Sequence, residues 1–132
     1  MGQGDRSRPL DVAGHLPHRP PFLLVDRVLE REPGVRVVAE ALITGSVPPS
    51  GFLLIEMLAQ AAGFLEADAL EGRQLFLAGV PEARFEALAR VGDRLRLEVA
   101  PVGAFGGLMK VQGAVSREAV VLCAASFLVK GL

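Results

Sequence analysis

A carboxylate lies in the middle of the most apolar stretch of this 132-residue chain. The segment from Gly51 to Gly63 reads GFLLIEMLAQAAG, and its only polar side chains are Glu56 and Gln60. A helix that is apolar on all sides is a buried helix, so the pattern predicts a central helix surrounded by other elements. Because an ionised carboxylate is costly to bury alone, we expect Glu56 to find hydrogen-bond donors or to keep its proton near neutral pH.

The start of this helix is also marked. Ser50 is a good N-cap and Gly51 opens the first turn, so the pattern predicts a helix from about Gly51 to Leu70. The free N–H groups at such an end can polarise a carbonyl oxygen, and Gln60, one turn beyond Glu56, can donate to the carboxylate. Two interpretations stay open: Glu56 is a general acid, or it is a structural partner of one arginine.

The rest of the chain reads as strands. Alternating or continuous apolar residues predict six of them, with turns at Glu32–Gly34, Gly103–Gly107 and Ser116–Glu118. The predicted strands are Phe22–Leu29, Val35–Ile43, Gln74–Val80, Arg94–Val99, Leu108–Val115 and Val120–Val129. One long helix among antiparallel strands is an α+β arrangement, in which a curved sheet encloses the helix. We expect residues 1–8 to be a flexible tail and residues 9–132 to form a single domain.

Composition narrows the possible functions. The net charge is −1, which gives no basic excess for nucleic acid or an anionic membrane, and we expect no membrane span. The start of the chain has no apolar signal segment, so we expect a cytoplasmic protein. Two histidines and one cysteine make a metal site implausible, Cys123 reads as a buried filler, and no serine has a neighbouring base. We expect no metal and no cofactor.

Three motifs, in order along the chain, resemble one enzyme family. They are Leu16–Val28 (LPHRPPFLLVDRV), Gly51–Gly63, and Leu77–Phe85 (LAGVPEARF) followed by Gly92-Asp93-Arg94-Leu95. Together they resemble the beta-hydroxyacyl-acyl-carrier-protein dehydratases of type II fatty acid synthesis, from about Leu16 to Phe127. The resemblance implies a hot-dog fold, in which a curved antiparallel sheet wraps one central helix. It also implies a homodimer or a hexamer built as a trimer of dimers.

The resemblance further implies a substrate and site residues. The substrate is a 3-hydroxyacyl thioester on the phosphopantetheine of acyl-carrier protein or coenzyme A. The acid of the family matches Glu56, its helix-start glycine matches Gly51, and its glutamine near the acid matches Gln60. The loop before the first strand implies Pro17 and His18 at the mouth of an acyl tunnel. Two further expected tunnel residues are Phe52 and Phe85.

The family's catalytic histidine has no counterpart in this chain. It belongs to a GHFPG-type segment before the helix, where this chain has the short connection Ile43–Gly51 without histidine. His18 is the candidate replacement, and water held by a backbone group is another. Three functions therefore stay open: a dehydratase with Glu56 as acid, a non-catalytic acyl-thioester-binding subunit or partner of an active paralogue, and a hot-dog thioesterase. A basic stripe at Arg90, Arg94 and Arg96 reads as a solvated face or as a site for a phosphate or an acidic carrier.

Overall fold

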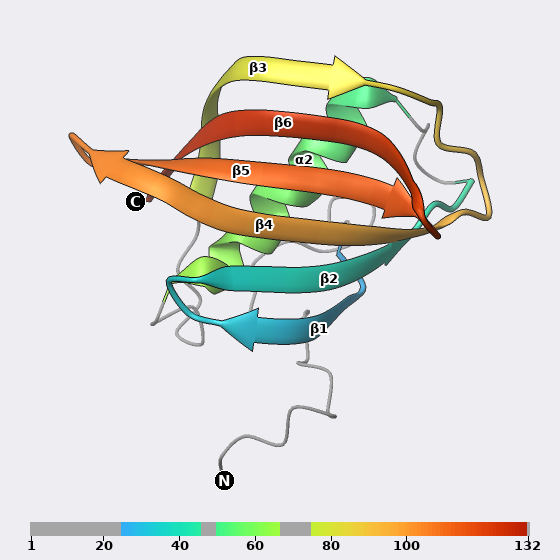
Figure 1. The fold of residues 1–132 in the computed structure, drawn as a ribbon, viewed down its shortest axis with the longest axis horizontal. Helices are drawn as coiled ribbons and strands as arrows, with labels where there is room; N and C mark the ends of the chain where they lie inside the picture. Colours follow the sequence, from blue (N-terminus) through green and yellow to red (C-terminus); the bar gives the residue numbers. More distant parts are fainter. Residues whose placement is uncertain (1–24, 46–49, 67–74, 132) are drawn as a thin grey trace, which may run out of the picture.

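A computed structural model describes residues 25–45, 50–66 and 75–131 of the chain. Within these residues, one helix packs into the hollow of a six-stranded antiparallel sheet (Figure 1). The elements are β1 (Arg27–Glu32), β2 (Arg36–Leu42), α2 (Gly51–Ala62), β3 (Leu75–Phe85), β4 (Arg94–Phe105), β5 (Leu108–Arg117) and β6 (Val120–Gly131). The α+β hot-dog architecture expected from the sequence is confirmed.

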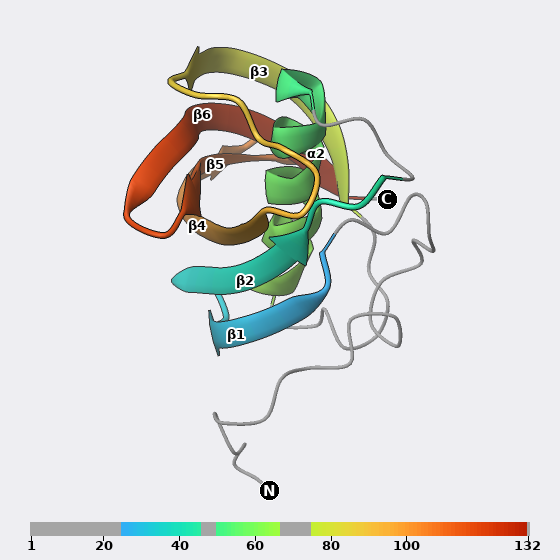
Figure 2. The ribbon, with the colours of Figure 1, turned by 90° about the vertical axis from the view of Figure 1, so that its right-hand side faces the viewer.

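The strand order in the sheet is β1-β2-β4-β5-β6-β3, so β1 and β3 form its edges. The sheet curls around α2, which lies against its concave side (Figure 2). β4 follows the predicted alternation: Leu95, Leu97 and Val99 are fully buried against the helix, while the charged residues between them face outward. β6 lies between β5 and β3, as its apolar sequence predicted for a central strand.

The helix packs tightly against β5 at a glycine. A Cβ on Gly113 would lie 3.2 Å from both methyl groups of Leu58 and 3.1 Å from a methyl group of Val99. Glycine therefore leaves the space that Leu58 fills on the inner face of β5. Apolar side chains from the helix and from every strand except β3 are buried around this contact, and residues of β3 pack against them.

The helix is shorter than predicted. It ends at Ala62, and Gly63–Leu65 continue as one turn of 3₁₀ helix before the extended Glu66. The prediction of a helix to Leu70 is therefore wrong for Gly63–Glu66, and residues 67–70 lie outside the described part. Arg31 of β1 accounts for the early end, because its guanidinium donates to the carbonyl oxygens of Phe64 (2.8 Å) and Glu66 (2.7 Å). These carbonyls bind a side chain instead of continuing the helical ladder.

The strands also differ from their predicted limits. β1 begins at Arg27 and runs to Glu32, later than predicted, and β3, β4, β5 and β6 each extend beyond the predicted end. β3 reaches Phe85 because a bulge accommodates Val80 and Pro81, which together lie opposite Phe127. Proline lacks an N–H and is tolerated in a sheet at an edge or a bulge, and Pro81 lies at both. No helix among the described residues is long and apolar enough to cross a membrane.

Candidate active site

At the N-terminal end of α2, a glycine leaves room for a neighbouring aromatic ring. Ser50 caps the helix, since its Oγ accepts the N–H of Leu53 at 3.2 Å. Gly51 follows, and a Cβ there would lie 2.8 Å from Cε1 of Phe85, at the end of β3. Figure 1 shows this first turn beside the arrowhead of β3. Glycine thus leaves room for the Phe85 ring beside the first turn of the helix.

Three of the predicted site residues follow from this end along one stripe of α2. Phe52, Glu56 and Gln60 are spaced four apart, so they lie one above the other on the helix. Phe52 is 69% exposed, Glu56 is half-buried, and Gln60 is buried with 5% exposed. The stripe is therefore open near the N-terminus and closed one turn past Glu56.

The expectation that Glu56 is fully buried is wrong for this chain. Its neighbours on either side, Ile55 and Met57, are buried, but Glu56 lies on the stripe that the sheet leaves partly open. The all-apolar sequence predicted a buried helix and did not reveal which position faces the opening. Accessibility is what a group that must reach a substrate requires.

Gln60 closes the inner end of the stripe. Its Oε1 accepts the N–H of Val25 at 3.3 Å, which ties α2 to the start of β1. The donation from Gln60 to Glu56 that the sequence suggested stays a prediction. A buried amide with a fixed acceptor bond holds its place, so Gln60 marks the buried end of the stripe.

The remaining candidates divide into two groups. The structure brings Gly51 and Phe85 together at the start of the helix, and Phe52 and Glu56 follow along the open stripe of α2. Pro17 and His18 lie outside the described residues, and so does His15. The described part of the chain holds no histidine. It also holds no group of three or more histidine, cysteine, aspartate or glutamate side chains that could bind a metal.

A loop held by backbone hydrogen bonds follows Phe85 at this end. It connects β3 to β4 through residues 86–93, and Ile43 pairs with it through two backbone hydrogen bonds, to Gly92 and to Asp93. Asp93 shapes the turn by accepting the N–H of Arg90 at 2.8 Å and a hydrogen bond from the guanidinium of Arg117 at 2.7 Å. These bonds, the backbone one first, hold the pKa of the Asp93 carboxyl below its usual range.

Two other predictions about individual residues can be checked. Cys123 is fully buried, and burial raises the pKa of its thiol to about 11, so it is the inert filler that the sequence indicated. In the basic stripe, Arg94 binds Glu40 at 2.9 Å, and Arg27 lies 3.6 Å from the same carboxylate. Part of that stripe is thus paired within the chain.

The site can act on a substrate with two polar centres. The helix N-terminus offers N–H groups and a partial positive charge to a carbonyl oxygen. Glu56 lies five residues further, about 7.5 Å along the axis, and side chains on a helix tilt back toward its N-terminus. A thioester carbonyl at Gly51 would therefore place a group on its third carbon within reach of a proton from Glu56.

A curved antiparallel sheet around one central helix defines a hot-dog protein. Solved structures agree on the fold. The dehydratase heterocomplex ApeI:P from Xenorhabdus doucetiae matches with a TM-score of 0.81 at 19% identity, covering 95% of this chain and 93% of that one. The smu.793 protein of Streptococcus mutans, bound to acetyl CoA, matches with a TM-score of 0.68 at 15% identity, covering 89% and 96%.

Sequence relatives identify the family. The 3-hydroxyacyl-[acyl-carrier-protein] dehydratase FabZ of Chromobacterium violaceum is 39% identical over 130 residues, covering 83% of this chain and 87% of the relative. FabZ of Coxiella burnetii is 38% identical over 138 residues, covering 92% and 97%. No family model matches the chain. With relatives this similar over most of its length, the chain belongs to the FabZ dehydratase family.

Proposed function

We propose that this chain eliminates water from a 3-hydroxyacyl thioester of acyl-carrier protein to give the trans-2-enoyl thioester. The observation that carries the proposal is the placement of Glu56 on the open stripe below the Gly51 end of α2, in a member of the FabZ family. The coenzyme A-bound fold relative supports a thioester on phosphopantetheine as the ligand. No cofactor is required for this elimination, and the cytoplasm is the proposed location.

Each step of the reaction has a proposed group. The N–H groups at Gly51 polarise the thioester carbonyl, which acidifies the proton on the second carbon. A base removes that proton, and the electron pair forms the double bond as the hydroxyl leaves the third carbon. Glu56 donates the proton that turns the departing hydroxyl into water, and the base then returns a proton to Glu56 through solvent. Phe52 and Phe85 form the apolar wall for the acyl chain, and Gln60 limits its depth.

The proposed base is His18, and Pro17 is a proposed substrate-binding residue. In the proposed homodimer, or a hexamer of three such dimers, the base and the acid of one site come from different subunits. This arrangement has a direct test by complementation. Glu56→Gln and His18→Ala should each be inactive, and a refolded mixture of the two should regain part of the activity, because one hybrid site has both groups. Two inactive variants that stay inactive when mixed would contradict a shared site.

A second candidate has its own observation. The histidine-free connection before α2 and the fold relative ApeI:P, which is a heterocomplex, favour a subunit that pairs with an active paralogue and receives its base from it. In that case the purified chain binds an acyl thioester analogue and turns over none. Appreciable turnover by the purified chain would remove this candidate.

The deciding experiment follows enoyl absorbance and free thiol together, with a 3-hydroxyacyl thioester as substrate. Enoyl product that Glu56→Gln abolishes supports the dehydratase. Thiol without enoyl product would instead indicate a thioesterase in which Glu56 activates water. Glu66→Gln is the matched control, because it makes the same change at the opposite end of the helix, where Arg31 uses only the backbone carbonyl of Glu66.

A further inference from the structure

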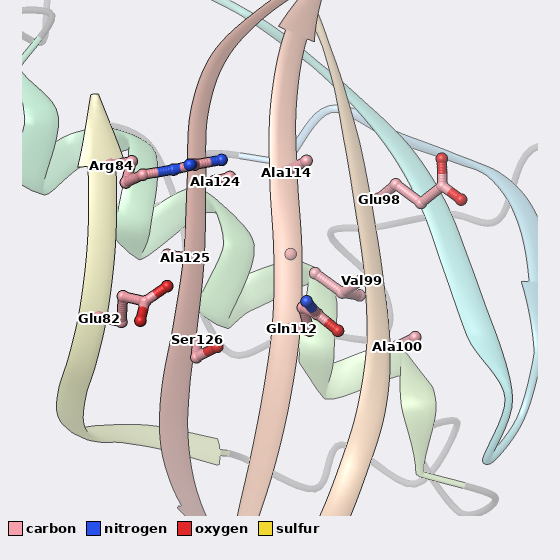
Figure 3. A pocket seen from close by; sticks show the side chains of 11 residues that line it. Glu82, Arg84, Glu98, Val99, Ala100, Gln112, Ala114, Ala124, Ala125 and Ser126 are labelled. Atoms are coloured by element: carbon pink, nitrogen blue, oxygen red, sulfur yellow. The ribbon is translucent and has the colours of Figure 1, made fainter. Parts of the chain in front are cut away.

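The outer face of the sheet has a hollow that the active site does not use. It encloses about 380 Å³ over the strands β3, β6, β5 and β4 (Figure 3). Strand register arranges its lining into two rows that cross the sheet. One row is Arg84, Ala124, Ala114, Glu98, and the next is Glu82, Ser126, Gln112, Ala100. Each row has small or neutral residues on the two central strands and a charged residue on β3.

The small residues are unusual for strands that face water. Alanine and glycine are poor strand formers, and the solvent face of an antiparallel sheet ordinarily carries larger polar side chains. Ala114 and Ala124 form the floor, and both are only half-buried in this chain. Small side chains on a sheet surface permit another surface to approach closely, which would compensate for their weak strand propensity.

The charges on the two sides of the floor are complementary to each other. Arg84 stands on the β3 side with 72% of its side chain exposed, and Glu98 stands on the β4 side with 49% exposed. Figure 3 shows both side chains at the same level of the sheet, on opposite sides of the floor. Their ion pairs within the chain are long: Arg84 is 3.9 Å from Glu86, and Glu98 is 3.8 Å from Arg36 and 3.9 Å from Arg96.

Two copies of this face are complementary when a two-fold axis parallel to the strands relates them. The axis lies between the two stacked sheets. It keeps each row at the same position along the strands, and it places the β3 side of one copy opposite the β4 side of the other. Arg84 then faces Glu98 of the second copy, and Glu98 faces Arg84 of the second copy. In the middle, Ala124 faces Ala114, and in the next row Ser126 faces Gln112, with which it can form a hydrogen bond. No like charges meet in either row.

The curvature of the sheet agrees with this arrangement. Because the sheet wraps α2, its outer face is convex (Figure 2). Two convex faces touch along the middle and diverge at the sides. Packed sheets lie about 10 Å apart, so small residues suit the middle, and long arginine and glutamate side chains are needed to bridge the sides.

We propose that this outer face docks a second copy of the chain, sheet against sheet, with reciprocal Arg84–Glu98 ion pairs. The contact leaves the edge of β3 and the N-terminal end of α2 uncovered. A particle that also associates through its sheet edges therefore gains further copies through this contact. The face, defined by the two rows above, is an interaction surface separate from the candidate active site.

Charge reversal tests the proposal through the mass of the particle in solution. Arg84→Glu places two glutamates opposite each other twice per contact, which should weaken association at least about tenfold at low salt and lower the mass of the particle. The mass is measured by sedimentation equilibrium over a dilution series. The double variant Arg84→Glu/Glu98→Arg exchanges the partners and should restore the wild-type mass.

Two further variants make the outcome decisive. Ala114→Arg introduces a long side chain at the closest approach, beside Glu98 on the neighbouring strand, and should lower the mass while Arg84 and Glu98 both stay in place. Arg90→Glu makes the same charge change in the loop outside the face and should leave the mass unaltered. The proposal is overturned if Arg84→Glu and Ala114→Arg, both folded by circular dichroism, keep the wild-type mass. It is equally overturned if the double reversal fails to recover that mass.

Discussion

The two ends of α2 are held in opposite ways. At the C-terminal end, the backbone carbonyls of Phe64, Leu65 and Glu66 all have partners: Arg31 binds the first and last, and the N–H of Gly34 binds Leu65 at 2.7 Å. At the N-terminal end, Ser50 supplies one cap bond, Gly51 leaves room for Phe85, and Phe52 is largely exposed. One end is fastened to the β1–β2 hairpin, and the other is left accessible.

The C-terminal end of the helix serves stability, and the N-terminal end is left available for binding a substrate. A helix terminus with unsatisfied N–H groups is a binding site for a carbonyl or an anion, and filling it with protein partners would remove that capacity. The fastened end fixes the axis of α2, so that the open end keeps its geometry without such partners. Substitutions at the two ends should therefore affect different measurements.

The largest effect is expected from Glu56→Gln. The substitution keeps the shape of the side chain and removes the proton that the leaving hydroxyl needs, so turnover should fall by about 10²–10⁴-fold. Thermal unfolding should change little, because Glu56 is half-buried on an open stripe. Retained turnover in Glu56→Gln, with Glu66→Gln as control, would remove Glu56 from the mechanism.

Gly51→Ala should be next. Its Cβ would lie 2.8 Å from the ring of Phe85, and the ring, being 52% exposed, can move aside. Alanine itself suits a helix, so stability should fall by only about 1 kcal/mol, while displacement at the N–H groups lowers kcat/KM by up to about 100-fold. Adding Phe85→Leu should relieve the clash and recover part of the loss. A Gly51→Ala variant with full kcat/KM would show that this contact does not position the substrate.

At the fastened end, Arg31→Met should act on stability alone. It removes two hydrogen bonds from a charged donor to carbonyls near the helix end, which should lower the free energy of unfolding by about 2 kcal/mol. Arg27→Met, on the same strand with a long, exposed ion pair to Glu40, should cost less than about 1 kcal/mol. Denaturant unfolding measures both. If the two variants unfold alike, Arg31 does not fasten the helix.

Ser50→Ala should cost about 1 kcal/mol through loss of the bond to the N–H of Leu53. Ser50→Asp retains an acceptor oxygen and should restore the unfolding free energy. An unaltered unfolding curve for Ser50→Ala would show that the cap is replaceable by water.

The smallest change is expected from Asp93→Ala, in the loop beside the open end. The pKa of this carboxyl is held below its usual range, so its charged form stabilises the folded chain above the ordinary aspartate pKa near 4. That contribution is lost as the pH falls through the lower pKa of the folded state. Wild type should therefore unfold at higher denaturant than Asp93→Ala at pH 7, and the gap should shrink in strong acid. A gap that grows in acid would contradict this sign.

The sequence predicted the start of α2 and the presence of each strand, because apolar periodicity and turn residues are local signals. The expected meander of all four strands after the helix is wrong for β3, which pairs with β6 instead of β4. It could not predict where the helix ends, since Phe64 and Leu65 are as apolar as the helix itself and the end depends on Arg31, more than thirty residues away. For the same reason Glu56 was expected to be enclosed: an apolar helix sequence does not reveal which stripe the sheet leaves open. The contact between Gly51 and Phe85 depends on a bulge at Pro81 that lets β3 run to Phe85.

The strand order has a consequence for how the chain folds. β4, β5 and β6 form a meander of neighbours in sequence, whereas β3 pairs only with β6, the last strand of the described residues. Contacts between distant segments form late because closing a long loop costs entropy before any pairing is gained. During synthesis, β3 must therefore wait unpaired until β6 leaves the ribosome. The Phe85 ring can reach its contact with Gly51 only after β3 pairs with β6. The N-terminal end of the helix is therefore the last part of the molecule to reach its native structure.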